Sequence, residues 1–231
     1  MVDHGADVNA RDRTGSTILY KLVKVSGNFS GDSYLRVAEW LIDKGADFDS
    51  LHAKGVTPFM LAISEGKTEI VDLLIAKGAL KNCINPQNGN TPLLLAIMAG
   101  QTEIVELLIA KGAAIEHANV EGYTALMAAV IKGHTEIAKL LIAKGADKDR
   151  VDAKGNTALM LAISKDQTEI VELLIEKDAA IDHANVEGNT ALMLAISQGN
   201  TEIAKLLIEK GADINCVDAE GDTALMRAAY R

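Results

Sequence analysis

The stretch Asn185–Val217, NVEGNTALMLAISQGNTEIAKLLIEKGADINCV, is one copy of a repeat that makes up most of this chain of 231 residues. A Gly-x-Thr motif marks each copy, and its glycines stand at positions 15, 55, 89, 122, 155, 188 and 221. The last four spacings are 33 residues each, while the first is 40 and the second is 34. A fixed period of this size predicts a stacked repeat architecture.

Each repeat carries the signals of a turn followed by two short helices. The segment Asn185–Asn189 has turn chemistry, with Gly188 available for a left-handed backbone. Thr190 is placed to cap a first helix over residues 191–197, and a second helix with a broad apolar stripe is expected over residues 201–210. Helices of about two turns are not stable alone in water. We therefore expect a solenoid in which neighbouring helix pairs cover one another.

These residues make the chain similar to the ankyrin repeat family over nearly its whole length. The matching residues are Gly188-x-Thr190-Ala191-Leu192, Ala195, Glu202-Ile203, Leu206-Leu207 and Gly211-Ala212-Asp213-x-Asn215. The resemblance implies an all-α fold, an ankyrin-repeat solenoid of stacked helix-turn-helix units with β-turn fingers. Tetratricopeptide repeats have a period of about 34 residues, but they lack the glycine-rich turn and the Gly-Ala-Asp exit found here.

One departure from the family is systematic. The ankyrin pattern Thr-Pro-Leu-His would place His at seven positions that hold other residues here, namely Tyr20, Met60, Leu94, Met127, Met160, Met193 and Met226. We expect apolar packing by the adaptable Met side chain to replace the hydrogen bonds of that His.

The repeats predict a single domain over residues 1–231. Residues 1–11 match only the tail of a repeat and residues 218–231 only the start of one. Between them lie repeats one to six, at residues 12–51, 52–85, 86–118, 119–151, 152–184 and 185–217. A longer period of 66 residues relates residues 117–127 to 183–193, which indicates that a block of two repeats was duplicated.

Repeats one and five depart from the pattern. Repeat one has seven extra residues within Ser26–Ser33, which predict a flexible surface loop, with Phe29 either touching a partner or folded onto its own helices. Trp40 falls where other repeats have Leu, so we expect it in the core. Repeat five has Asp166 and Asp178 where its neighbours have turn glycines.

Composition excludes several classes of function. The formal net charge of −9 is unfavourable for binding nucleic acid or an anionic membrane. No signal peptide is visible, and no apolar run approaches the ~18 residues of a membrane span. Cys83 and Cys216 lie about four repeats apart and are expected to stay unpaired. Unpaired cysteines favour the cytoplasm or another reducing intracellular compartment, that of a host cell included, and we expect a monomer there.

Residues that carry chemistry are spread by the repeat instead of being gathered. His117 and His183 occupy the same position two repeats apart, whereas a zinc site needs about four converging ligands. No phosphate loop, nucleophile elbow or Cys/His pair is present, so we expect no metal, no cofactor and no enzymatic activity. In animal members of the family, Asn residues placed like Asn9 and Asn215 can be hydroxylated. We expect these side chains to bond turn backbone instead.

The resemblance implies a protein-binding scaffold that uses its concave face and turn tips. Two positions should face solvent there. One follows the turn Gly: Ser16, Val56, Asn90, Tyr123, Asn156, Asn189 and Asp222. The other lies near the end of the first helix: Lys24, Ser64, Met98, Ile131, Ser164 and Ser197.

Most copies of these two positions are polar, but repeats three and four break the pattern together. The predicted partner-binding residues are Met98, Val120, Tyr123, Ile131 and Lys132, because exposed apolar clusters that include Tyr often mark interfaces. The alternative is that the array is the targeting or substrate-recruitment segment of a larger enzyme or effector whose catalytic domain lies outside this chain.

Overall fold

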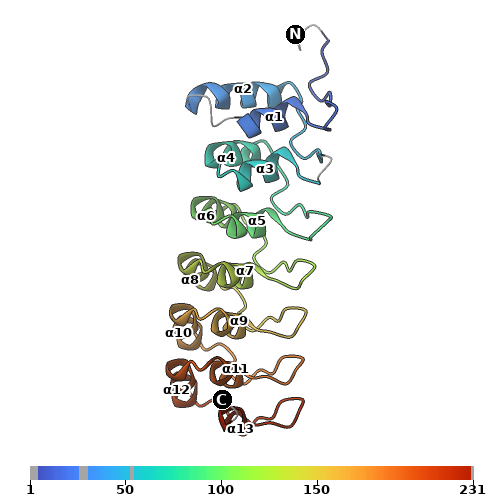
Figure 1. Ribbon diagram of the computed structural model, residues 1–231. Coiled ribbons are helices and arrows are strands. Elements are labelled where there is room, and N and C mark those ends of the chain that lie inside the picture. Colours follow the sequence, from blue (N-terminus) through green and yellow to red (C-terminus); the bar gives the residue numbers. More distant parts are fainter. Residues whose placement is uncertain (1–4, 26–30, 53–54, 230–231) are drawn as a thin grey trace. The chain divides into compact units, whose positions relative to one another are not determined.

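The computed structural model describes residues 5–25, 31–52 and 55–229 of the chain (Figure 1). The chain divides into two compact modules, the first at Met1–Ala114 and the second at Ile115–Arg231. Within the described residues every regular element is a helix, apart from the isolated β-bridges of Val151 with Thr157 and Val217 with Thr223. The predicted all-α solenoid class is confirmed, whereas the single domain over residues 1–231 stays a prediction.

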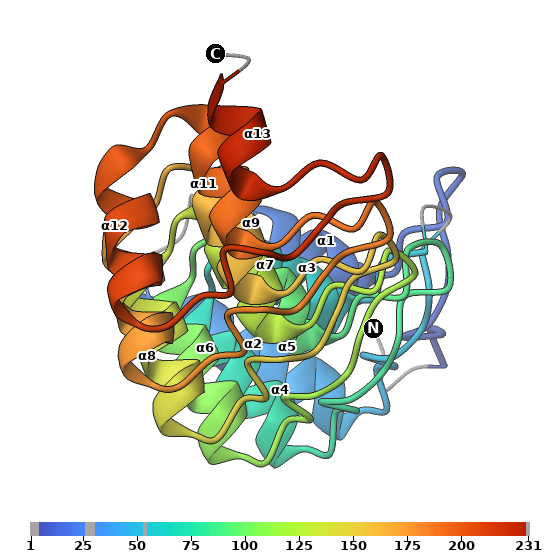
Figure 2. The same cartoon turned by 90° about the horizontal axis from the view of Figure 1, so that it is seen from below.

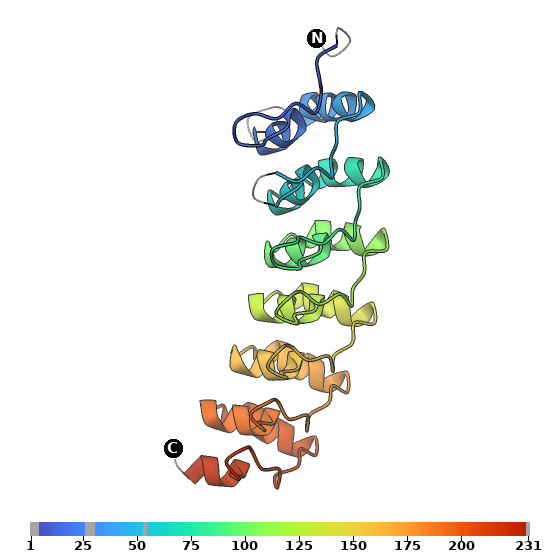
Figure 3. The same ribbon diagram turned by 90° about the vertical axis from the view of Figure 1, so that its right-hand side faces the viewer.

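The first module holds three helix pairs, one for each of repeats one to three. They are α1 (Ile18–Val25), α2 (Gly31–Asp43), α3 (Pro58–Ser64), α4 (Thr68–Ala76), α5 (Pro92–Met98) and α6 (Thr102–Ala110). The first helices α1, α3 and α5 pack in one row, and the second helices α2, α4 and α6 pack in another (Figure 3). Each pair therefore rests on the pairs beside it, as a solenoid requires.

The second module repeats this arrangement. It contains α7 (Ala125–Lys132), α8 (Thr135–Ala143), α9 (Ala158–Ser164), α10 (Thr168–Glu176), α11 (Ala191–Gln198), α12 (Thr201–Glu209) and α13 (Ala224–Ala229). The first helices α7, α9, α11 and α13 pack in sequence. Each is preceded by a turn segment that we call a finger, and Figure 2 shows α7, α9 and α11 between the fingers and the second helices. The inner face of a module is the side formed by its fingers and first helices.

The helix starts follow the sequence prediction. The hydroxyl of Thr57 accepts the N–H of Met60 at 3.1 Å, and Thr190 accepts that of Met193 at 3.4 Å. Thr91, Thr124 and Thr157 cap their helices in the same way. These bonds satisfy N–H groups that have no partner within the helix.

The helix stops need a left-handed residue, which is where glycine is favoured. Gly133 and Gly199 fill this position after α7 and α11, with φ of 71° and 73°. Repeat five has aspartates there, and both are left-handed: Asp166 has φ of 55° and Asp178 has φ of 58°. An L-residue with a side chain adopts this conformation at a cost of about 1–2 kcal/mol.

The core lies between successive helix pairs. Met60, Met127, Met160 and Met193 are buried there, at the position where the family pattern has His. The expected replacement of a polar side chain by apolar Met packing is therefore confirmed in those repeats. Met226 does not follow the expectation, since it is 49% exposed in α13. Tyr20 is the polar exception, and its ring stacks on that of His52 with centroids 4.5 Å apart.

A second set of contacts joins repeats through the loops that follow the second helices. The Oδ1 of Asn9 accepts the N–H of Asp47 at 2.8 Å, and its Nδ2 donates to the carbonyl of Gly45 at 2.9 Å. Four further side-chain oxygens accept a backbone N–H of the next repeat in the same way. Asn82 accepts from Ala114, Glu116 from Asp147, Asp149 from Ala180 and Asp182 from Asp213. Asn9 therefore bonds turn backbone, as expected from the sequence.

Two expectations for repeat one were wrong. Trp40 is 42% exposed, because the Leu residues at its position, such as Leu73 and Leu107, are themselves only half-buried. That position lies at the edge of the second helix, where a ring as large as indole cannot be covered. The predicted loop is also shorter than expected, since Gly31–Ser33 form the first turn of α2. Residues 26–30, with Phe29, lie outside the described residues.

Candidate partner-binding surface

Each finger of the second module is held by the first side chain in it. In repeat five, the Oδ1 of Asp152 accepts the N–H groups of Lys154 and Asn156, both at 2.8 Å. The same two bonds are made by Asn119 in repeat four, Asn185 in repeat six and Asp218 in the partial repeat of residues 218–231, which we call repeat seven. A short polar side chain that bonds its own backbone in this way stabilises a tight turn.

This bond explains why one predicted position is not on the surface. The residue after the turn Gly was expected to face solvent, but Ser16, Asn90 and Asn189 are buried and the other copies are half-buried. The N–H of Ser16 bonds Asp12 and that of Asn189 bonds Asn185, the first side chains of their fingers, while the N–H of Asn90 bonds Asn88. Each bond draws the residue into the turn. There the Nδ2 of Asn189 donates to Glu187 at 2.9 Å.

The second predicted position behaves as expected. Lys24, Ser64, Met98, Ser164 and Ser197 are exposed, and only Ile131 is half-buried. In repeat three the two positions meet, because the Nδ2 of Asn90 lies 3.4 Å from the Sδ of Met98. Tyr123 and Ile131 are the corresponding residues of repeat four.

The five predicted binding residues differ in exposure and are divided between the modules. Met98 ends α5 in the first module and is 41% exposed. The second module contains the other four: Val120 is 70% exposed at a finger tip, Lys132 is exposed, and Tyr123 and Ile131 are half-buried. A joint cluster of Met98 with Tyr123 and Ile131 would span both modules and stays a prediction.

Tyr123 has the chemistry of a hydrogen-bond donor. Burial raises the pKa of its phenol above the ordinary value, and the carboxylates of Glu121 and Asp152 raise it further. The group is therefore neutral at physiological pH and keeps its proton. A half-buried ring with a polar tip combines apolar contact area with one directed bond, as interface tyrosines do.

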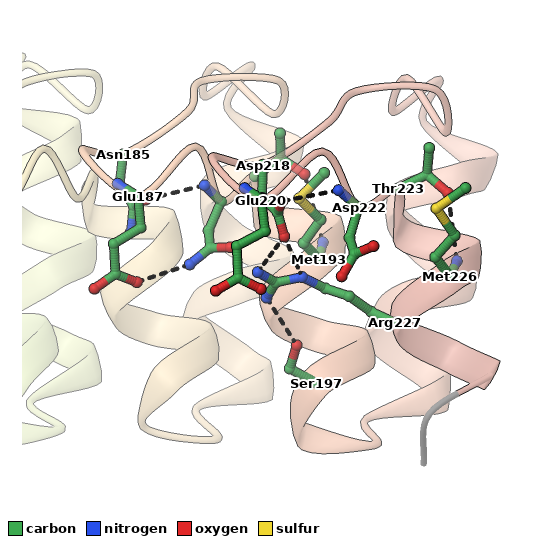
Figure 4. A network of polar contacts seen from close by, with 12 residues as sticks. Asn185, Glu187, Met193, Ser197, Asp218, Glu220, Asp222, Thr223, Met226 and Arg227 are labelled. Atoms are coloured by element: carbon green, nitrogen blue, oxygen red, sulfur yellow. Dashed lines mark hydrogen bonds and ion pairs between the residues drawn. The ribbon is translucent and has the colours of Figure 1, made fainter.

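A polar network at the end of the second module was not foreseen from the sequence (Figure 4). Arg227 in α13 stands where repeats five and six have Leu161 and Leu194. Its Nε donates to the Oδ2 of Asp218 at 2.8 Å, its Nη2 donates to the same oxygen, and its Nη1 reaches the hydroxyl of Ser197 at 3.3 Å. The backbone N–H of Asp222 lowers the pKa of Asp218, burial opposes that shift, and Arg227 adds to it.

Metal binding and nucleophilic chemistry find no support in the described part of the chain. It contains no group of three or more His, Cys, Asp or Glu residues arranged to hold a metal ion. The ring of His183 instead bonds the carbonyl of Gly155 at 3.0 Å. Burial raises the pKa of Cys83 to about 11, so its thiol is protonated and unreactive near pH 7. None of the described helices is long and apolar enough to cross a bilayer.

Comparisons with known proteins agree with this architecture. The family described as ankyrin repeats in three copies matches residues 29–119, 111–185 and 180–231. Among solved structures, the ankyrin repeat domain of Bcl-3, described as a unique member of the IkappaB protein family, is similar at 29% identity with a TM-score of 0.83, over 94% of this chain and 95% of that one. No curated protein matches. Ankyrin repeats are generally protein-interaction modules without catalytic activity of their own, and the chain belongs to the ankyrin repeat family.

Proposed function

We propose that this chain is a scaffold that binds a protein partner through its inner face and finger tips. The observation that carries the proposal is the contrast between a constant frame and a variable surface. The core positions repeat with little change, whereas the exposed position at the end of the first helix varies from Ser64 and Ser164 to Met98. Variable exposed positions on a constant frame are what the binding surface of a repeat array requires.

The centre of the proposed contact in the second module is Tyr123 with Ile131, flanked by Val120 and Lys132. The Asn90–Met98 contact supports placing Tyr123 beside Ile131, because the two pairs occupy the same positions of successive repeats. Such a pair offers a partner an apolar area with a phenol at its edge. Met98 is the proposed contact residue of the first module.

The experiment is to recover partners with the full chain by affinity capture, purify one, and measure its affinity for variants. Tyr123→Ala and Ile131→Ser should each weaken binding by about 1–3 kcal/mol. Ser164→Ala and Ser197→Ala are matched controls at the position of Ile131 and should change little. If Tyr123→Ala and Ile131→Ser bind as tightly as the wild type, the contact lies elsewhere on the array. Circular dichroism must show that all four variants are folded.

We further infer that the array acts as a monomer, without metal or cofactor, and has no catalytic activity of its own. Light scattering during size-exclusion chromatography tests the monomer. As part of a longer chain, the same surface would recruit a substrate or target for a catalytic domain elsewhere. The complete open reading frame distinguishes these cases, because it either contains a further domain or does not.

A further inference from the structure

The fingers of the second module are joined into one rigid surface. We call this the finger strip, made of residues 119–122, 152–155, 185–188 and 218–221. The N–H of Ala153 donates to the carbonyl of Glu121 at 3.1 Å, that of Val186 to Lys154 at 3.1 Å, and that of Ala219 to Glu187 at 3.0 Å. Every finger of the strip therefore holds the next by a backbone hydrogen bond.

The glycines show how closely these fingers approach one another. A Cβ placed on Gly122 would lie 2.8 Å from the backbone N of Ala153, and one on Gly188 would lie 2.7 Å from that of Ala219. Contacts this short leave no room for a side chain. Backbone packed this tightly cannot move one finger without its neighbour, so the strip is organised before any partner arrives, which lowers the entropic cost of binding.

The strip presents an apolar and acidic surface. At its tips, Val120 is 70% exposed and Val186 is 72% exposed. Beside these tips, Glu121, Glu187 and Glu220 are exposed, against the single cation of Lys154. Figure 4 shows Glu187 and Glu220 on successive fingers with their carboxylates pointing the same way. Exposed valine side chains are unfavourable in water, and an apolar surface surrounded by charged residues often marks a binding site.

The charge is specific to this part of the chain. The second module carries 19 acidic and 12 basic side chains, a net charge of −7, and so accounts for most of the −9 of the whole sequence. The described finger tips of the first module, Arg13 with Thr14 and Pro86 with Gln87, contain no acidic residue. The acidic strip would attract a positively charged segment and repel nucleic acid.

We propose that the finger strip binds an extended, Lys/Arg-rich protein segment whose apolar residues contact Val120 and Val186. This inference rests on the proposed function and names the chemistry of the partner. The two valines are two repeats apart, which at roughly 10 Å per layer is about 20 Å. An extended chain covers that distance in about six residues. Basic side chains next to each apolar residue would meet Glu121 and Glu187, and one about three residues further along would meet Glu220 on the next finger. The segment between them, which passes the finger of Lys154, would be uncharged.

The test uses the full chain and fluorescent synthetic peptides of equal length. The first peptide has two Val about six residues apart with Ser between them, an Arg next to each Val, and a further Arg about three residues after the second Val. The second peptide replaces Arg by Glu, and the third replaces Val by Ser. The first should bind, and raising the salt from about 50 to about 500 mM should weaken it strongly. The second and third should bind at least about tenfold more weakly.

Variants of the strip should act on the same peptide. The triple variant Glu121→Gln, Glu187→Gln, Glu220→Gln and the double variant Val120→Ser, Val186→Ser should each weaken the first peptide by about tenfold or more. The matched control is Glu172→Gln, Glu176→Gln, Glu209→Gln, which removes the same charge from exposed positions of α10 and α12. It should change the affinity by less than about twofold.

Several results would overturn the proposal. They are equal binding of the Arg and Glu peptides, no binding of the Arg peptide to the wild type, and equal losses in the strip variants and the control. The outcome is separable from that of the proposed function. A partner that no longer binds Tyr123→Ala but still binds both strip variants would support the proposed scaffold function and overturn the proposal for the finger strip. A partner that binds Tyr123→Ala and Ile131→Ser normally but does not bind the strip variants would support the proposal for the finger strip.

Discussion

Arg227 and Asp218 form a paired contact in the last finger, in which Nε of Arg227 donates to Oδ2 of Asp218 at 2.8 Å and the Asp218 side chain is 1% exposed. The pair follows from a change nearby. In repeat five, Asn156 donates its side-chain amide to Asp152 at 3.2 Å, but the corresponding residue of repeat seven is Asp222, whose side chain has no donor to offer. A buried carboxylate needs hydrogen-bond donors, and the guanidinium of Arg227 provides them from the helix.

This pair makes stability depend on pH. The pKa of Asp218 is lowered in the folded chain, so its contribution is complete above the unfolded value of about 3.9 and disappears as the pH falls through the folded pKa. Arg227→Gln raises that folded pKa and should lower the urea midpoint at pH 7, with a smaller difference near pH 3. Arg150→Gln, at an exposed arginine, is the control. An equal deficit of Arg227→Gln at both pH values would contradict the assignment.

The left-handed aspartates of repeat five should respond differently to glycine. Asp178→Gly should stabilise the chain by about 0.5–1 kcal/mol, because φ of 58° is strained for Asp and natural for Gly. Asp166→Gly relieves the same strain but removes the 2.7 Å bond from Asn200 to the Asp166 carboxylate, so its gain should be smaller. Chemical denaturation of both variants measures the order. A lower midpoint for Asp178→Gly would show that the position is not strained.

The close approach of the fingers can be measured with two alanine substitutions. Gly188 and Gly211 are both left-handed, with φ of 76° and 90°. A Cβ on Gly188 meets the backbone of Ala219 at 2.7 Å, whereas a Cβ on Gly211 has nothing within 4 Å. Gly188→Ala should therefore cost about 1–3 kcal/mol more than Gly211→Ala. Equal losses in urea unfolding would mean that the fingers can separate freely.

Trp40 is the only tryptophan of the chain, so its fluorescence reports one site. Because the side chain is 42% exposed, its emission should be that of a hydrated indole and should be quenched readily by iodide. Trp40→Leu restores the residue of the other repeats and should change stability by no more than about 0.5 kcal/mol. Emission typical of a buried ring, or a large loss in Trp40→Leu, would place Trp40 in the core after all.

Much of the fold could be predicted because its determinants are local and repeated. The cap of Thr190 on Met193 and the stop at Gly199 depend on residues within a few positions of one another. The same signals recur in each repeat, so each helix boundary is predicted independently several times. Even the exceptions could be located, since the aspartates at 166 and 178 adopt the left-handed backbone that the glycines of neighbouring repeats mark.

The rest depends on contacts between residues that are distant in sequence or on the size of a side chain. Trp40 aligned with leucines, but the sequence does not say that the position is only half covered. The exposure of the residue after the turn Gly was mispredicted, because its N–H bonds a side chain earlier in the same turn, as Asn189 does with Asn185. The Arg227 pair could have been suspected from Asp222, because Asp lacks the side-chain amide that Asn156 has at the same position of repeat five.

The bonds from Asp149 to Ala180 and from Asp182 to Asp213 each link a repeat to the next one and to no other. An evolutionary consequence follows. A duplicated block of whole repeats carries its own acceptor and donor for the bond at the new junction. The longer array therefore has the same hydrogen bond between every pair of neighbouring repeats. Growth by duplication is then structurally neutral at the moment it happens, and the 66-residue period is the trace expected of such an event. Selection can afterwards change surface residues of one copy, as at Tyr123 against Asn189, while the other copy keeps the original.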